Sequence, residues 1–196
     1  LSFSGGKQDQ YAAAFGGFNF MEFGPDDKVL INPLKPQNWI LNQLESSIIL
    51  YYSGKSRLSS EIISSQINAI SLDKNKELNE MFKIKNSAIE MKSALLKGEF
   101  ANFSNILKSS WEAKKSLSNL ITNKLLSDIY ETALTAGALS GKITGAGGGG
   151  FFIFFVKPIN RNKVVEKLKK FNGYTINFNF HLRGSESWNI SSNFYK

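Results

Sequence analysis

The sequence contains no cysteine and a single histidine, His181. The lack of cysteine excludes a disulfide framework, a thiolate metal site and a cysteine nucleophile. One histidine cannot form a histidine-rich zinc site, and we predict no metal ligand among the residues of this chain. No apolar run approaches the roughly 18 residues of a membrane span. Because the chain also does not open with a basic segment followed by an apolar one, we expect a cytoplasmic protein without a membrane segment.

Arginine is scarce as well, although the chain is strongly basic. The 196 residues carry 24 Lys and Arg against 16 Asp and Glu, a formal net charge of +8. Only Arg57, Arg161 and Arg183 are arginines, and the lysines are spread along the chain among many Asn and Ile residues. This distribution does not favour a nucleic-acid surface, so we expect no nucleic-acid partner. A basic surface attracts a small phosphorylated substrate equally well.

Apolar periodicity and turn residues predict an α+β fold, with helices on one face of a mostly antiparallel sheet. The predicted helices span residues 7–14, 58–70, 78–96, 100–120, 122–136 and 162–171, with a further short helix that begins at residue 39. The predicted strands form a hairpin within 18–31, turning at 24–27, and continue over 47–52, 151–156, 174–182 and 188–190. Thr122 is the expected N-cap of the helix that Gly137 ends. Pro33 and Pro36 bracket a predicted boundary.

The most unusual feature is a Gly-rich loop, residues 145–150, in which five of the six positions are glycine. Glycine permits positive φ and a close approach of the backbone to a ligand, and successive N–H groups in such a loop can bind an anion. The loop is neither a dinucleotide-binding fingerprint nor a P-loop, because an apolar strand rather than a helix follows it. The alternative is a tight turn between a helix and a buried strand.

A second candidate is Asp9, which follows Gly5-Gly6 in the first turn of a predicted helix. The helix dipole favours an ionised carboxylate in this position. Such a carboxylate can orient a hydroxyl or remove its proton. The alternative is an ordinary acidic residue at a helix start.

Four blocks of the sequence resemble the C-terminal half of the GHMP kinases, the superfamily of galactokinase, homoserine kinase, mevalonate kinase and phosphomevalonate kinase. The blocks are residues 5–19, 52–60, 111–118 and 137–151. They occur in the family's order and extend over essentially the whole chain. The resemblance is greatest to the sugar-1-kinase branch, which contains heptose-phosphate kinases and fucokinases.

The resemblance implies transfer of the γ-phosphoryl group of ATP, with Mg²⁺, to the anomeric hydroxyl of D-glycero-D-manno-heptose 7-phosphate. Asp9 matches the family's catalytic aspartate, which would accept or polarise the proton of that hydroxyl. Thr144 and Arg57 are candidates for binding the sugar phosphate, although Arg57 fits a surface ion pair equally well. The residues that match the third family motif, and are expected at the ATP phosphates, are Gly145, Ala146, Gly147, Gly148 and Gly149.

Two parts of the family pattern are absent from residues 1–196: the Gly-Leu-Gly-Ser-Ser-Ser phosphate cradle and the basic residue that partners the aspartate. We therefore interpret residues 1–35 as the end of an N-terminal lobe and residues 36–196 as the C-terminal lobe, and we expect this chain alone to be inactive. Uncovered aromatic residues predict self-association through residues 15–31. Two alternatives remain open: a fucokinase-like kinase of another sugar, and a non-catalytic basic binding module.

Overall fold

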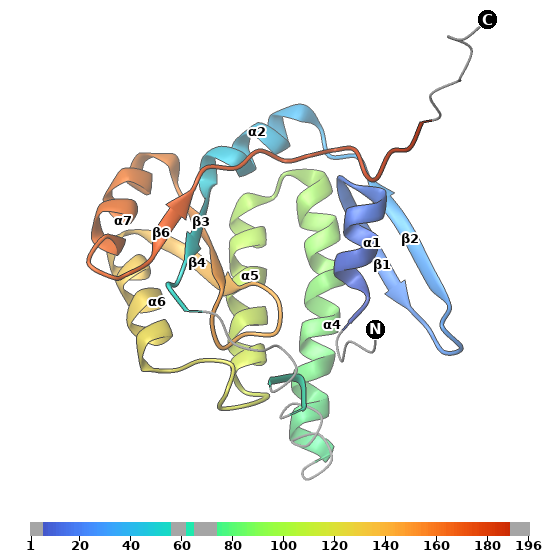
Figure 1. Ribbon diagram of the computed structural model, residues 1–196, viewed down its shortest axis with the longest axis horizontal. Helices are drawn as coiled ribbons and strands as arrows, with labels where there is room; N and C mark the ends of the chain where they lie inside the picture. Colours follow the sequence, from blue (N-terminus) through green and yellow to red (C-terminus); the bar gives the residue numbers. More distant parts are fainter. Residues whose placement is uncertain (1–5, 56–61, 65–73, 189–196) are drawn as a thin grey trace, which may run out of the picture. The chain divides into compact units, whose positions relative to one another are not determined.

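The computed structural model describes residues 6–55, 62–64 and 74–188 (Figure 1). These residues divide into two compact units. The larger contains Pro36–Asn179, and the smaller combines Gly6–Lys35 with the chain from Phe180 onward. The division lies where the prolines indicated a boundary, whereas nothing in the sequence indicated that residues after 179 group with the smaller unit. Within the described ranges, no helix is both long enough and apolar enough to cross a membrane.

The smaller unit contains one helix and a two-stranded antiparallel hairpin, as the sequence predicted. Its elements are α1 (Gln8–Phe15), β1 (Phe18–Phe23) and β2 (Val29–Leu34). Helix α1 ends at Gly16, whose φ of 64° is a left-handed conformation that glycine adopts without strain. A Cβ at this position would lie 2.1 Å from the backbone of Arg183. Gly17 donates its N–H to the His181 carbonyl at 3.0 Å, so the late segment packs against the end of α1.

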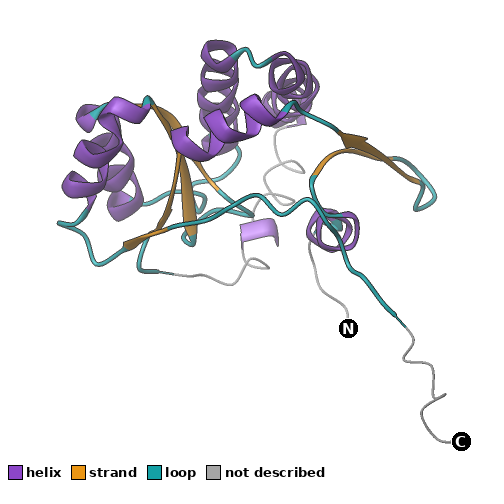
Figure 2. Ribbon diagram, turned by 90° about the horizontal axis from the view of Figure 1, so that it is seen from above, coloured by secondary structure: helices purple, strands orange, loops and turns teal. Residues whose placement is uncertain are grey.

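In the described residues, the larger unit contains a four-stranded antiparallel sheet in the order β4-β5-β3-β6. Its strands are β3 (Ile48–Tyr52), β4 (Ala138–Ile143), β5 (Phe151–Val156) and β6 (Tyr174–Ile176). Its helical elements are α2 (Asn38–Ser47), α4 (Lys74–Lys97), α5 (Phe100–Lys115), α6 (Lys124–Ala136), the 3₁₀ turn η1 (Pro158–Asn160) and α7 (Arg161–Leu168). Helices flank these strands in the view from above (Figure 2). The predicted α+β fold class is confirmed.

One face of this sheet carries the main hydrophobic core. Ile49 pairs in register with Phe154 and Tyr51 with Phe152, so alternation along the strands brings all four side chains to the same face. Each of the four is at most 1% exposed. Helices α6 and α7 cover this face with apolar residues at helical spacing. Their residues in the core cluster are Leu126, Ile129, Tyr130, Ala133, Ala136, Val164 and Leu168.

Helix α5 packs against the edge strand β4 and contacts both sides of the sheet. Its Trp111 is buried in the core cluster. Its Phe103 packs against Phe155, with ring centroids 5.3 Å apart, and Phe155 faces away from the core because it directly follows a core residue in β5. The hydroxyls of Ser104 and Ser140 lie 2.9 Å apart and join α5 to β4. Helix α5 is therefore fixed against the strand that leads into the Gly-rich loop.

The start of α6 differs from the prediction by one residue. Asn123, not Thr122, is the N-cap, and its side chain accepts the Leu126 N–H at 3.1 Å. Both residue types can cap a helix, so the sequence alone does not separate two adjacent candidates. At the other end, Gly137 follows α6 with a φ of 118°, as predicted.

Other predicted elements also differ in extent from the described structure. Helix α5 ends at Lys115, short of the predicted residue 120. Strand β6 is shorter than the predicted 174–182, and Trp188 is not in a strand. Of the predicted helix over 58–70, only residues 62–64 are described, and they are helical. Residues 189–190 lie outside the described part of the chain.

Candidate active site

The Gly-rich loop connects two adjacent antiparallel strands, β4 and β5. Thr144 closes it by donating its N–H and its hydroxyl to the Phe151 carbonyl, at 2.8 and 3.2 Å. The alternative of a turn between a helix and a strand is wrong, because β4 lies between α6 and the loop. The sequence analysis missed this strand because Ala138–Ile143 contains Gly141 and lacks regularly alternating large apolar residues.

Positive φ angles run through the loop, with 65° at Gly145, 111° at Gly147 and 87° at Gly150. A Cβ on Gly147 would lie 3.0 Å from the Ile121 side chain, so this glycine packs against the protein. At Gly145 and Gly150, no atom of the described residues beyond the adjoining ones lies within 4 Å of the Cβ position. With respect to the described residues, the backbone at both ends of the loop is therefore uncovered, and a ligand can approach it closely.

The main-chain N–H groups of the loop fall into two sets. Gly148 donates to the Ile121 carbonyl at 2.8 Å, and Gly150 donates to the Lys55 carbonyl at 2.7 Å. These two bonds anchor the later half of the loop. Successive N–H groups without an acceptor can bind an anion. No described residue accepts from the N–H groups of Gly145, Ala146 and Gly147.

Two lysines that the sequence analysis did not single out lie at the start of the loop. Lys114 of α5 donates from Nζ to the Gly145 carbonyl. Lys142 of β4 donates from Nζ to the Ser110 hydroxyl at 2.7 Å. Because Ser110 and Lys114 are four residues apart on one helix, they face the same way. The position of Lys114 within the 111–118 block was the signal that could have identified it.

The described residues supply no carboxylate partner for either lysine. Burial, and then the positive charge of Lys142, lowers the pKa of Lys114 to about 8. Burial also lowers the pKa of Lys142 below its ordinary value. Among the described residues, neither lysine forms an ion pair with a carboxylate. Neighbouring, partly buried cations without a counter-ion favour the binding of an anion.

The other predicted site residues are distributed as follows. Asp9 is exposed in the first turn of α1, and no described residue forms a hydrogen bond or ion pair with it. It belongs to the smaller unit and the Gly-rich loop belongs to the larger unit, so a joint role in one site stays a prediction. Thr144 is exposed at the loop entrance. Arg57 lies outside the described residues.

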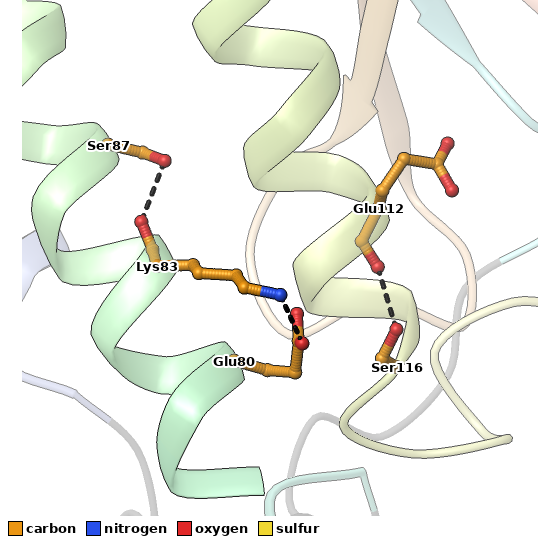
Figure 3. Close-up of polar contacts among 5 residues, drawn as sticks. All are labelled: Glu80, Lys83, Ser87, Glu112 and Ser116. Atoms are coloured by element: carbon orange, nitrogen blue, oxygen red, sulfur yellow. Dashed lines mark hydrogen bonds and ion pairs between the residues drawn. The ribbon is translucent and has the colours of Figure 1, made fainter. Parts of the chain in front are cut away.

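Two surface cavities of about 550 Å³ each lie elsewhere in the larger unit. One lies between α6 and α7, and its charged lining residues are Asp128, Glu131, Lys163, Lys167 and Lys170. The other lies between α4 and α5 and is lined in part by Glu80, Lys83, Glu112 and Ser116 (Figure 3). There, Lys83 pairs with Glu80 at 2.6 Å, and the Ser116 hydroxyl donates to the main chain of its own helix. Neither cavity contains a predicted site residue.

The Gly-rich loop and the two strands that flank it lie within a stretch of the chain that matches a known family of domains. Residues 91–173, which include α5, α6, β4, β5, α7 and the loop, match the family described as GHMP kinases C terminal. The matched stretch makes up less than half of the chain, and it contains the Gly-rich loop with the two strands that flank it.

Particular relatives extend the match over nearly the whole chain. The sequence is 43% identical to the D-glycero-alpha-D-manno-heptose 7-phosphate kinase of Campylobacter jejuni, over 97% of this chain and 56% of that protein. It is 27% identical to the L-fucokinase/L-fucose-1-P guanylyltransferase of Bacteroides fragilis, over 80% of this chain and 17% of that protein. A crystal structure of a D-glycero-D-manno-heptose 1-phosphate kinase from Bacteroides thetaiotaomicron superposes with a TM-score of 0.71 at 40% identity, over 97% of this chain and 51% of that one. The chain thus spans about half the length of the first of these relatives and of this solved kinase.

Proposed function

We propose that this chain is part of an ATP-dependent sugar-phosphate kinase, which transfers a phosphoryl group from ATP to the anomeric hydroxyl of D-glycero-D-manno-heptose 7-phosphate. The observation that carries the proposal is the similarity to a heptose 7-phosphate kinase over nearly the whole chain. The loop geometry supports it, because three successive N–H groups and two lysines offer donors suited to phosphate oxygens.

The proposed roles are those that the resemblance to the sugar-1-kinases implies for each residue. Asp9, in the first turn of α1, accepts or polarises the proton of the anomeric hydroxyl. The backbone of residues 145–149 lies at the phosphates of ATP. Thr144 and Arg57 bind the sugar phosphate.

Mg²⁺ is the proposed cofactor of the transfer, bound largely by the phosphates of ATP, as is usual in phosphoryl-transfer sites. The N–H and ammonium groups at the loop are donors, which suit phosphate oxygens and cannot ligate a cation. Among the described residues, no three carboxylates or imidazoles gather as a metal site. The loop therefore fits the phosphates that carry the ion rather than the ion itself.

The proposed enzyme is cytoplasmic and consists of two lobes. Residues 1–35 complete an N-terminal lobe that supplies the phosphate cradle, and residues 36–196 form the C-terminal lobe. In the smaller unit, Phe15, Phe23 and Leu30 are 50%, 49% and 57% exposed. These apolar side chains support the proposal that the isolated chain associates with itself through residues 15–31.

The test of the catalytic role uses the longer protein that contains this chain. Asp9→Asn is expected to lower the turnover number by about 100-fold to 10,000-fold, the usual contribution of a positioned general base. Asp26→Asn is the matched control, because it removes an exposed carboxylate at a φ of 57°, a conformation that asparagine tolerates. Unchanged turnover in Asp9→Asn contradicts the proposed role.

A second candidate function is phosphorylation of fucose or another unphosphorylated sugar, which the similarity to an L-fucokinase favours. A substrate panel separates the two. The proposed enzyme is expected to prefer D-glycero-D-manno-heptose 7-phosphate strongly over the same heptose without its phosphate. Equal or better use of L-fucose would favour the second candidate.

A further inference from the structure

Charge and hydrogen-bond donors converge at the start of the Gly-rich loop. Lys114 of α5 donates to the loop at the Gly145 carbonyl, and Lys142 of β4 donates to Ser110, one helical turn before Lys114. The two lysines are close enough for the charge of Lys142 to depress the pKa of Lys114. Both side chains are partly buried, and no carboxylate among the described residues neutralises them. The fold therefore maintains two adjacent cations beside open backbone, an arrangement that a bound anion would stabilise.

We propose that Lys114 and Lys142, together with the N–H groups of Gly145–Gly147, form a binding site for a phosphate group. This inference deepens the proposed function and rests on it for the identity of the ligand. Two ligands of that function carry the required chemistry: the phosphate chain of ATP and the phosphate of the sugar. We define the site by the phosphate group that both ligands carry.

The donor count supports this assignment. A lysine ammonium has three N–H donors. Lys114 uses one on the Gly145 carbonyl, and Lys142 uses one on the Ser110 hydroxyl, so each keeps donors for a ligand. The bond to Gly145 also places the Lys114 ammonium next to the first of the loop N–H groups that have no acceptor among the described residues. These directional donors, added to two charges, suit phosphate better than a monovalent carboxylate.

Proton linkage gives the site a measurable signature. A bound phosphate stabilises the charged form of both lysines, so it must raise the pKa of each. Conversely, phosphate affinity must fall as the pH rises through the pKa of Lys114 at about 8. A purely structural lysine would not respond to phosphate in this way.

The experiment titrates the chain of residues 1–196 with inorganic phosphate at constant ionic strength, while the Cε signals of isotope-labelled lysines are followed by NMR. The signals of Lys114 and Lys142 are expected to shift with one shared saturation curve. Lys114→Met and Lys142→Met are each expected to weaken binding about tenfold to a hundredfold, which is the usual effect of losing a charge-assisted hydrogen bond. Lys108→Met removes an exposed lysine of the same helix and is the matched control.

Lys114→Arg separates ligand binding from loop support, because arginine keeps the charge and the donors. It is expected to retain phosphate binding, whereas Lys114→Met loses it with unchanged circular dichroism. If Lys114→Met does not fold, Lys142→Met decides the question. Shifts that never saturate, or that are equal at Lys108, overturn the proposal, as does wild-type phosphate affinity in both methionine variants.

Displacement experiments identify the source of the phosphate. ATP and D-glycero-D-manno-heptose 7-phosphate are each added to the phosphate-bound chain, with the unphosphorylated heptose as control. Displacement by either phosphorylated ligand supports the site and names its source, and displacement by neither overturns it. No phosphoryl transfer is measured, so failure of the kinase assay and failure of this site remain distinguishable.

Discussion

Lys114 and Gly145 are 31 residues apart in the sequence and are joined by a hydrogen bond from the lysine Nζ to the glycine main-chain carbonyl. The bond ties α5 to the first residue of the Gly-rich loop. Because the β4 strand that enters the loop is also joined to α5, through the hydroxyls of Ser104 and Ser140, the helix supports the loop from its entrance. The shape of the loop thus depends on α5, which is separated from the loop in the sequence by α6 and β4.

The lowered pKa of Lys114 predicts a pH-dependent stability. This pKa is about 8 in the folded chain against an ordinary value of 10.5, so the unfolded state binds more protons between these values. The contribution of Lys114 to the unfolding free energy is present above the pKa of this lysine in the unfolded state. It is lost as the pH falls through the pKa of the lysine in the folded state. The unfolding free energy of the wild type, relative to Lys114→Met, is therefore expected to rise between about pH 8 and pH 10.

Urea denaturation of the two proteins at several pH values measures this difference. Lys108→Met again serves as the control, because it removes one positive charge from an exposed position on α5. A constant difference between wild type and Lys114→Met across that interval would contradict the burial of a charged Lys114.

Two buried tyrosines are expected to respond oppositely to loss of their hydroxyl. The Tyr51 hydroxyl donates to the Leu168 carbonyl at 3.3 Å, whereas the Tyr130 hydroxyl is buried without a partner among the described residues. Tyr51→Phe should lower the unfolding free energy by about 1 kcal/mol, because it leaves a carbonyl without its donor. Tyr130→Phe should leave it unchanged or raise it by about 1 kcal/mol, because it removes an unsatisfied polar atom. Denaturant unfolding of the two variants measures both changes in unfolding free energy. An equal decrease in Tyr51→Phe and Tyr130→Phe would contradict the prediction.

The sequence predicted most elements whose residues follow one period. The apolar positions of α6 recur at helical spacing, and the continuous run of Phe151–Val156 predicted a buried strand. Strand β4 has no such signal, because Gly141 and polar residues occupy it and it is held by pairing with β5. The prediction of Tyr174–Leu182 as one strand failed for a related reason: pairing with β3 extends only to Ile176, although alternation continues.

The candidate site was predictable only where local sequence is unusual. Five glycines in six positions identified the loop, and their positive φ angles bear out the expected conformational freedom. Lys114 and Lys142 are two among 21 lysines, and only the packing of α5 on β4 distinguishes them. Partial burial, and the lack of a carboxylate partner among the described residues, depend on the folded chain, so composition cannot reveal them.

The N-cap of α6 gives a further test of local structure. Asn123 accepts the Leu126 N–H, whereas the hydroxyl of the neighbouring Thr122 forms its hydrogen bond, among the described residues, with the Ser127 hydroxyl at 3.3 Å. Asn123→Ala should therefore lower the unfolding free energy by about 1 kcal/mol, and Thr122→Ala should have little effect. Thermal unfolding of both variants measures the difference. A larger loss of unfolding free energy in Thr122→Ala than in Asn123→Ala would identify Thr122 as the N-cap instead.

The last prediction concerns association of the isolated chain. Leu30 is 57% exposed on β2, a strand that in the described residues pairs only with β1 and so leaves its other edge unpaired. An exposed apolar edge strand is a template for pairing with another chain. The chain of residues 1–196 is therefore expected to self-associate at high concentration, and Leu30→Lys should reduce this association.

Sedimentation of matched variants tests the location of the contact. Ile159→Lys is the control, because Ile159 is 87% exposed in the larger unit and lies outside the predicted contact. Residues 36–179 alone should sediment as a monomer and unfold cooperatively, since they contain the complete core cluster. The piece ends at residue 179 rather than at 196, because the chain from Phe180 packs with the smaller unit and would lose its cover. A monomeric full chain would mean that the apolar edge is covered within the chain. Association that Ile159→Lys abolishes and Leu30→Lys does not would place the contact in the larger unit instead.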